Sequence, residues 1–212
     1  AGLIAGKQLK NPFDYGFHVV TSTTHKTLRG PRGGLILSKG TVSNPAKAPE
    51  KTIENLPTLI DRSVFPGLQG GPHMSQVLAK AVAFKEAAQP EFETYAAQVI
   101  KNAQRLASQL SDKGFRLIGG GTENHLILAD IYSSFKVSGG EAEATLDKVH
   151  LTANKNSIPE DTRKFFDPSG LRLGTPAITT RGMKEKDMDQ VADWIYRAIT
   201  NRNDEAYLDK LG

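Results

Sequence analysis

The sequence contains no cysteine among its 212 residues, and only 7% of its residues are aromatic. Without cysteine, the chain cannot form disulfide bonds, thiolate nucleophiles or zinc sites built on cysteine. Long hydrophobic runs are also missing. The longest, such as residues 126–129, are far shorter than the roughly 20 residues that a membrane helix needs. We therefore expect no membrane-spanning segment and no membrane partner.

Neither sign of charge dominates, because 27 Lys and Arg residues stand against 23 Asp and Glu residues and give a net charge of +4. A mildly basic chain suits an enzyme that acts on anionic substrates. The charges are spread along the chain, whereas nucleic-acid modules gather basic and aromatic side chains on one surface. We therefore expect no nucleic-acid partner. The His, Asp and Glu residues also lack the spacing of metal ligands, so we expect no metal site.

The pattern of hydrophobic residues predicts an α/β chain without internal repeats. Residues 39–62 are polar, contain three prolines and predict a long surface excursion. Pro90 predicts a boundary between two domains, residues 1–90 and residues 91–212. The first looks like the end of a larger sheet domain, and the second like a small α+β domain. Strands are predicted at residues 18–24, 35–38, 115–118, 125–130 and 171–173. Helices are predicted at residues 74–88, 92–110, 140–149 and 188–199. The helix at residues 188–199 is expected to be the final one.

Residues 21–34 hold the densest set of reactive side chains. Lys26 lies among hydroxyl groups and beside His25 at the end of a predicted strand. A lysine that forms a Schiff base needs a lowered pKa, and nearby cations such as Arg29 and Arg32 lower it. The hydroxyl groups and the glycine backbone can bind phosphate oxygens. A basic surface turn is the alternative interpretation, whereas a nucleotide P-loop is excluded because no Gly-Lys-Ser/Thr follows the glycines.

The segments at residues 21–37, 64–72, 154–159 and 169–182 carry ordered motifs. Together they resemble the serine hydroxymethyltransferase family, and the resemblance covers nearly the whole chain. The resemblance implies a fold-type I enzyme, of the aspartate aminotransferase kind, that binds pyridoxal phosphate (PLP). Residues 1–90 would then be the C-terminal part of the large PLP-binding domain, and residues 91–212 the small C-terminal α+β domain. The four segments follow the order of that family.

The resemblance also assigns roles around the cofactor. Lys26 matches the lysine that carries PLP covalently, and the neighbouring His25 matches a histidine that tunes substrate and reaction specificity. A glycine pair matches a loop that reaches the cofactor phosphate of the neighbouring subunit, which suits glycine because bare backbone N–H groups approach a phosphate closely. The residues that match the cofactor site of the family are Thr23, His25, Lys26, Arg32, Gly70 and Gly71.

The substrate site is implied in the same way. Arg172 matches the arginine that binds the α-carboxylate of the amino acid, and a planar guanidinium suits two hydrogen bonds to a carboxylate better than a lysine does. Asn156 matches a residue at the pterin of folate, and Phe165 and Phe166 lie in the segment beside folate. Taken alone, an arginine in a strand is more often a surface residue, and both phenylalanines suit ordinary packing.

The resemblance implies reversible transfer of a one-carbon unit, in which L-serine and tetrahydrofolate give glycine and 5,10-methylenetetrahydrofolate. It also implies a homodimer or larger oligomer with shared active sites, in the cytoplasm or an organelle. The family's Asp-x-x-His stretch, whose aspartate pairs with the pyridine nitrogen of PLP, stands just before the first residue of this sequence. We therefore expect the C-terminal half of such an enzyme, inactive alone, with a separate N-terminal chain as a further partner. The alternatives are another fold-type I PLP enzyme, such as a threonine aldolase, and a non-catalytic fragment.

Overall fold

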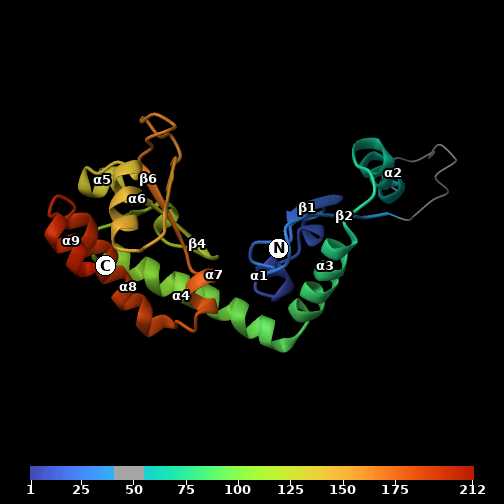
Figure 1. Cartoon of the computed structure of the whole chain (residues 1–212), viewed down its shortest axis with the longest axis horizontal. Helices are drawn as coiled ribbons and strands as arrows, with labels where there is room; N and C mark the ends of the chain where they lie inside the picture. The colour runs from blue at the N-terminus through green and yellow to red at the C-terminus, as the bar shows by residue number, and fades with distance from the viewer. Residues whose placement is uncertain (41–54) are drawn as a thin grey trace. The chain divides into compact units, whose positions relative to one another are not determined.

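The computed structural model describes residues 1–40 and 55–212. The chain forms two compact units, residues 1–96 and residues 97–212 (Figure 1). Each unit combines helices with antiparallel strands, so the described residues agree with the predicted mixture of helix and sheet. Within these described ranges, no helix is long and apolar enough to cross a membrane.

The first unit is built around one pair of strands. β1 (Val19–Thr23) runs antiparallel to β2 (Gly34–Ser38), and both predicted strands are confirmed. Their pairing brings together the two ends of the segment 24–33, which carries the predicted lysine. The other elements of this unit are α1 (Gly2–Ala5), the 3-10 helix η1 (Pro12–Tyr15), α2 (Leu56–Arg62), the π-helical turn η2 (Ser63–Leu68) and α3 (Met74–Ala87).

The predicted surface excursion at residues 39–62 is wrong at its C-terminal end, because α2 begins at Leu56. Pro57 lies in the first turn of this helix, where its missing backbone N–H removes no helical hydrogen bond. A proline can therefore start a helix as well as interrupt one. Residues 41–54 of the predicted excursion lie outside the described residues.

α3 confirms the helix predicted at residues 74–88, but its apolar side chains do not form the core of the unit. Only Ala83 and Ala87 are buried on this helix, whereas its larger apolar residues are exposed. The small core instead joins Ala87 to Leu28 and Phe92. The exposed apolar residues of α3 are Met74, Val77, Leu78, Val82 and Phe84.

α4 (Pro90–Asp112) is the helix predicted at residues 92–110. It begins at Pro90, whose fixed φ suits a first helical turn. After its end the chain turns at Gly114, which adopts a φ of +88°, a conformation that glycine reaches without a steric penalty. Leu106 and Leu110 of α4 are buried in the core of the second unit.

The second unit contains a four-stranded antiparallel sheet in the order β3-β4-β6-β5. Alternate side chains of a strand point to opposite faces, so Leu171 and Leu173 are buried while Arg172 is exposed. Buried residues of α4, α6 and α8 pack with the two leucines in one core. Arg172 therefore projects from the face opposite the core. The strands are β3 (Arg116–Leu117), β4 (Leu126–Asp130), β5 (Asn154–Asn156) and β6 (Gly170–Gly174), and two of the helices are α6 (Gly139–Lys148) and α8 (Glu185–Thr200).

Most long elements of the second unit are confirmed, and the short ones are where the predictions fail. The strand predicted at residues 115–118 is only two residues long, because the 3-10 helix η3 (Ile118–Gly120) begins at once. The helix at 188–199 is not the final one. Helices of five to seven residues make fewer than two turns, and a three-residue strand shows barely one alternation, so neither reveals a clear hydrophobic period. The missed elements are α5 (Ile131–Phe135), β5, α7 (Pro176–Thr180) and α9 (Glu205–Leu211).

The assignment of the two sheet faces predicts unequal effects of two leucine substitutions. Leu171→Ala removes a side chain that is 0% exposed, so the free energy of unfolding should fall by roughly 2–5 kcal/mol. Leu126→Ala removes one that is 39% exposed and should cost about 1 kcal/mol or less. Chemical denaturation of both variants checks this prediction, and equal losses would contradict the assignment of the faces.

Candidate functional site

The loop that joins β1 to β2 is closed by hydrogen bonds from a buried threonine. The hydroxyl of Thr24 donates to the carbonyl oxygen of Pro31 at 2.6 Å. The backbone N–H of Thr24 donates to the carbonyl oxygen of Gly33 at 3.1 Å. The N–H of Gly30 in turn donates to the carbonyl of Thr24 at 2.8 Å. These bonds fix the backbone on both sides of the loop, so the residues between them have a defined position.

Lys26 and His25 lie inside this closed loop. The backbone N–H of Gly33 donates to Nδ1 of His25 at 3.4 Å, so Nδ1 is the accepting nitrogen of the ring. The side chain of Lys26 is exposed, and none of the ion pairs between described residues involves it. The loop therefore carries an exposed lysine next in sequence to a histidine whose ring accepts a backbone hydrogen bond. Thr23 ends β1 and is half-buried, and Arg32 is exposed on the same loop.

Arg29 and Tyr95 help to hold the loop, and the sequence analysis did not identify this contact. The guanidinium carbon of Arg29 lies 3.5 Å from the centre of the Tyr95 ring. Arg29 also has a positive φ of 61°, and its backbone N–H donates to the carbonyl of Lys26 at 2.9 Å. A cation above an aromatic ring is a favourable contact. Only the tertiary structure could reveal this pair, because 66 positions separate the two residues in the sequence.

Gly70 and Gly71 lie between η2 and α3, where both are exposed. A Cβ atom built on either glycine would meet no other heavy atom within 4 Å. Their surroundings are therefore open enough for a phosphate to reach the backbone N–H groups. The role of this pair stays a prediction.

In the second unit, Arg172 and Asn156 line one cavity of about 640 Å³. The register of the sheet explains this, since β5 pairs with β6 so that Asn154 lies opposite Arg172 and Asn156 opposite Gly170. One guanidinium nitrogen of Arg172 lies 3.5 Å from Oδ1 of Asn154. Because Arg172 projects from the open face, its guanidinium can donate two parallel hydrogen bonds to a carboxylate in a planar arrangement.

The rest of the cavity wall comes from residues that the sequence analysis did not assign. The turn after β3 contributes Gly119 and Gly120, whose positive φ values of 76° and 73° bend the chain over the open face of the sheet. Glu123 and Leu128 also line the cavity. A run of three glycines in the sequence was the one available signal of this turn. The cavity thus combines a cation, an acid and an amide with the apolar side chain of Leu128.

Phe165 and Phe166 lie elsewhere in the second unit. Their side chains are 89% and 69% exposed, on the connection between β5 and β6. Neither lines the cavity that holds Asn156 and Arg172. The structure therefore brings together two of the four residues predicted to bind substrates, and the roles of both phenylalanines stay predictions.

His125 lies just before β4 and has a polar atom without a partner. Its Nδ1 is buried and has no hydrogen-bond partner among the described residues. Burial, together with the positive charge of Arg172, lowers the pKa of His125 below its ordinary value. The neutral ring is therefore the form that the folded chain favours.

Comparison with known proteins decides the family. The family model described as serine hydroxymethyltransferase matches residues 1–195. The chain belongs to this family. Relatives named serine hydroxymethyltransferase occur in Xanthomonas campestris strain B100, with 53% identity, and in Acidobacterium capsulatum, with 48% identity, each over 211 residues and 100% of this chain. The chain spans 48% and 46% of these two relatives, about half of their length.

The closure of the lysine loop predicts the effect of Thr24→Val. Valine has a similar shape but cannot donate to Pro31, so the carbonyl of that residue loses a buried partner. The loss should cost on the order of 1–3 kcal/mol and speed amide exchange at Gly30 and Gly33. Hydrogen exchange measures both changes. Ser22→Ala, which removes a hydroxyl with a long 3.4 Å bond, is the control, and an equal effect there would contradict the role of Thr24.

The lowered pKa of His125 predicts a pH effect with a definite sign. The unfolded chain takes up a proton at this side chain near its ordinary pKa of about 6.5, whereas the folded chain does so only at lower pH. Stability should therefore fall as the pH is lowered through and below about 6.5. His125→Gln should weaken this dependence, and His150→Gln should retain it. Unfolding at several pH values, with imidazole titration by NMR, tests the sign.

Proposed function

We propose that this chain carries the lysine and the carboxylate-binding residues of a PLP-dependent serine hydroxymethyltransferase. The reaction would convert L-serine and tetrahydrofolate to glycine and 5,10-methylenetetrahydrofolate. One observation carries the proposal: the exposed amine of Lys26 lies in a loop closed by Thr24, in a chain of this family. The relatives support it, because they bear the name of this activity.

The residues of the loop fit PLP chemically. Lys26 supplies an exposed amine for the cofactor aldehyde, and Thr23, His25 and Arg32 supply a hydroxyl, an imidazole and a cation on the same loop. Gly70 and Gly71 would offer backbone N–H groups to a phosphate, in the neighbouring subunit if the family arrangement holds. When bound, PLP supplies an electron-withdrawing ring that stabilises negative charge on the substrate's α-carbon.

The open face of the second unit would bind the amino acid and folate. Arg172 binds the α-carboxylate through two hydrogen bonds, which fixes the orientation of the bonds around the α-carbon. Asn156, on the same cavity wall, would contact the pterin of tetrahydrofolate. Phe165 and Phe166 would cover folate with exposed aromatic surface. His25 would hold or move a proton near the amine of Lys26, since its ring is oriented by Gly33.

The wider architecture and assembly belong to the same proposal. The family implies a fold-type I enzyme in which residues 1–90 complete a large PLP-binding domain and residues 91–212 form the small domain. We propose a homodimer or larger oligomer with shared active sites, in the cytoplasm. We also propose that residues 1–212 alone do not turn over serine and require a polypeptide that corresponds to the other half of the relatives, because the aspartate expected at the pyridine nitrogen lies in that half.

Covalent trapping tests the role of Lys26 directly. The purified chain is incubated with PLP, reduced with borohydride and mapped by mass spectrometry. We expect one labelled site at Lys26, lost in Lys26→Ala and retained in Lys10→Ala, a control at another exposed lysine. Labelling spread evenly over exposed lysines would show that the loop has no special affinity for the cofactor.

Complementation tests the reaction. The chain is mixed with the segment of the Xanthomonas campestris relative that precedes the matched part, and serine cleavage is measured with and without tetrahydrofolate. We expect folate-dependent activity, reduced about 100-fold or more in Arg172→Lys, because an ammonium cannot form the planar pair of bonds. Cleavage of threonine without folate would instead support an aldolase, and absence of activity would support a non-catalytic fragment.

A further inference from the structure

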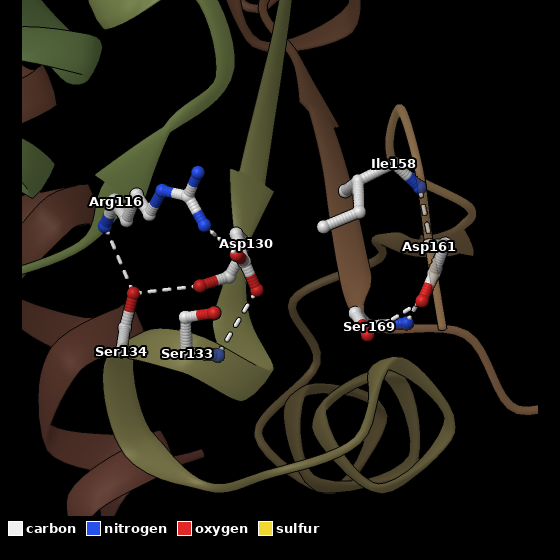
Figure 2. Close-up of polar contacts among 7 residues, drawn as sticks. All are labelled: Arg116, Asp130, Ser133, Ser134, Ile158, Asp161 and Ser169. Atoms are coloured by element: carbon white, nitrogen blue, oxygen red, sulfur yellow. Dashed lines mark hydrogen bonds and ion pairs between the residues drawn. The ribbon is translucent and has the colours of Figure 1, made fainter. Parts of the chain in front are cut away.

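The connection between β5 and β6 is closed by a single carboxylate. Oδ2 of Asp161 accepts hydrogen bonds from the backbone N–H groups of Ile158, at 3.3 Å, and Ser169, at 2.9 Å. Oδ1 accepts from the backbone N–H of Arg163 at 3.0 Å and from the hydroxyl of Ser169 at 2.7 Å. Figure 2 shows the carboxylate between Ile158 and Ser169. One side chain thus bonds both the beginning and the end of the connection.

These bonds act on the residues assigned to substrates. Ile158 lies two residues after Asn156, and Ser169 comes directly before β6, three residues before Arg172. The backbone has little room to adjust, because a Cβ atom built on Gly170 would lie 2.7 Å from Cγ2 of Ile158 and would also collide with the carbonyl of Asn156. A shift of this connection would therefore move Asn156 and Arg172 together.

Asp161 is an acceptor suited to this position. Partial burial alone would raise the pKa of its carboxyl, but the hydrogen bonds from Ser169, Arg163 and Ile158 lower that pKa to about 2. The carboxylate is therefore ionised at any pH well above 2. An amide at this position would turn an NH₂ group toward at least one N–H donor and lose that bond.

The outer part of the same connection has a separate support. Nη2 of Arg163 donates to Oδ2 of Asp167 at 2.5 Å, and the guanidinium lies 4.5 Å from the ring centre of Tyr132. Oδ1 of Asp167 accepts from the N–H of Gly140 at 3.3 Å. This second set holds the tip, which carries the two exposed phenylalanines. Asp161 instead holds the base, next to the two strands.

We propose that Asp161 is a positioning residue for the substrate site, because its carboxylate fixes the β5–β6 connection and thereby the places of Asn156 and Arg172. The proposal rests on the proposed function, which assigns those two side chains to folate and to the amino acid. It adds a residue that touches neither substrate. Asp161 acts through the backbone, so its loss should change the cavity without removing any group that lines it.

NMR of the full chain tests this proposal in Asp161→Asn. We expect the Nε–H signal of Arg172 and the side-chain amide signals of Asn156 to move, and titrations with glycine and with tetrahydrofolate to show binding weakened about tenfold or more. Asp161→Glu keeps the charge and should restore part of the affinity. Ser169→Ala removes one bond of the four, and serves as a milder variant if Asp161→Asn fails to fold.

Asp130→Asn is the matched control. Asp130 is buried at the end of β4 opposite Gly170, where it accepts from the N–H of Ser133 and from Nη1 of Arg116, as Figure 2 also shows. This variant should lower stability while the Arg172 and Asn156 signals stay in place. Equal movement of those signals in Asp130→Asn, or none in Asp161→Asn and Ser169→Ala, would overturn the positioning role.

The same data separate this proposal from the proposed function. If the unmodified chain binds neither glycine nor tetrahydrofolate, the assignment of Arg172 and Asn156 to substrates fails. The signals of the unliganded variants still decide whether Asp161 positions the two side chains. If the unmodified chain binds and Asp161→Asn binds equally well with unmoved signals, the positioning role fails while the substrate site stands.

Discussion

The antiparallel pairing of β4 with β6 is the constraint on which the second unit depends. In this register Leu128 lies opposite Arg172 and Ala129 opposite Leu171. A slip by one residue would turn Leu171 toward solvent and drive Arg172 into the apolar core. Burial of the leucine face against α4, α6 and α8 opposes that slip strongly. The position of Arg172 is thus set by the hydrophobic residues on either side of it.

Short polar side chains complete what the strand pairing begins. Asp130 closes the end of β4, Asp161 closes the connection that leads into β6, and Thr24 closes the loop that carries Lys26. In each case a side-chain oxygen accepts a hydrogen bond from, or donates one to, a backbone group that has no partner within a regular helix or strand. This matters because an unsatisfied buried polar group is costly. The same kind of hydrogen bonding therefore supports the lysine loop in the first unit and the Arg172 cavity in the second.

The lysine loop and the Arg172 cavity differ in how they are built. The lysine loop owes its shape to bonds within one short segment, together with the Arg29–Tyr95 contact. The cavity with Arg172 gathers residues from β4, β5, β6 and the glycine turn after β3. A local loop can be recognised from consecutive residues, whereas a cavity of this kind exists only when distant strands pair. This difference explains why Lys26 and His25 stood out in the sequence and why Glu123 and Leu128 did not.

The sequence by itself determined the family, the order of the long helices and strands, and the residues that match known motifs, because periodicity and consecutive motif residues are local properties. It missed α5, α7 and α9, which are too short to show a period, and it could not foresee that the apolar residues of α3 stay exposed. Only the tertiary structure decided that Arg172 and Asn156 share a cavity while Phe165 and Phe166 lie outside it. Only the fold could show that Asp161 bonds both ends of one connection, since such bonds require the β5–β6 pairing that brings those ends together.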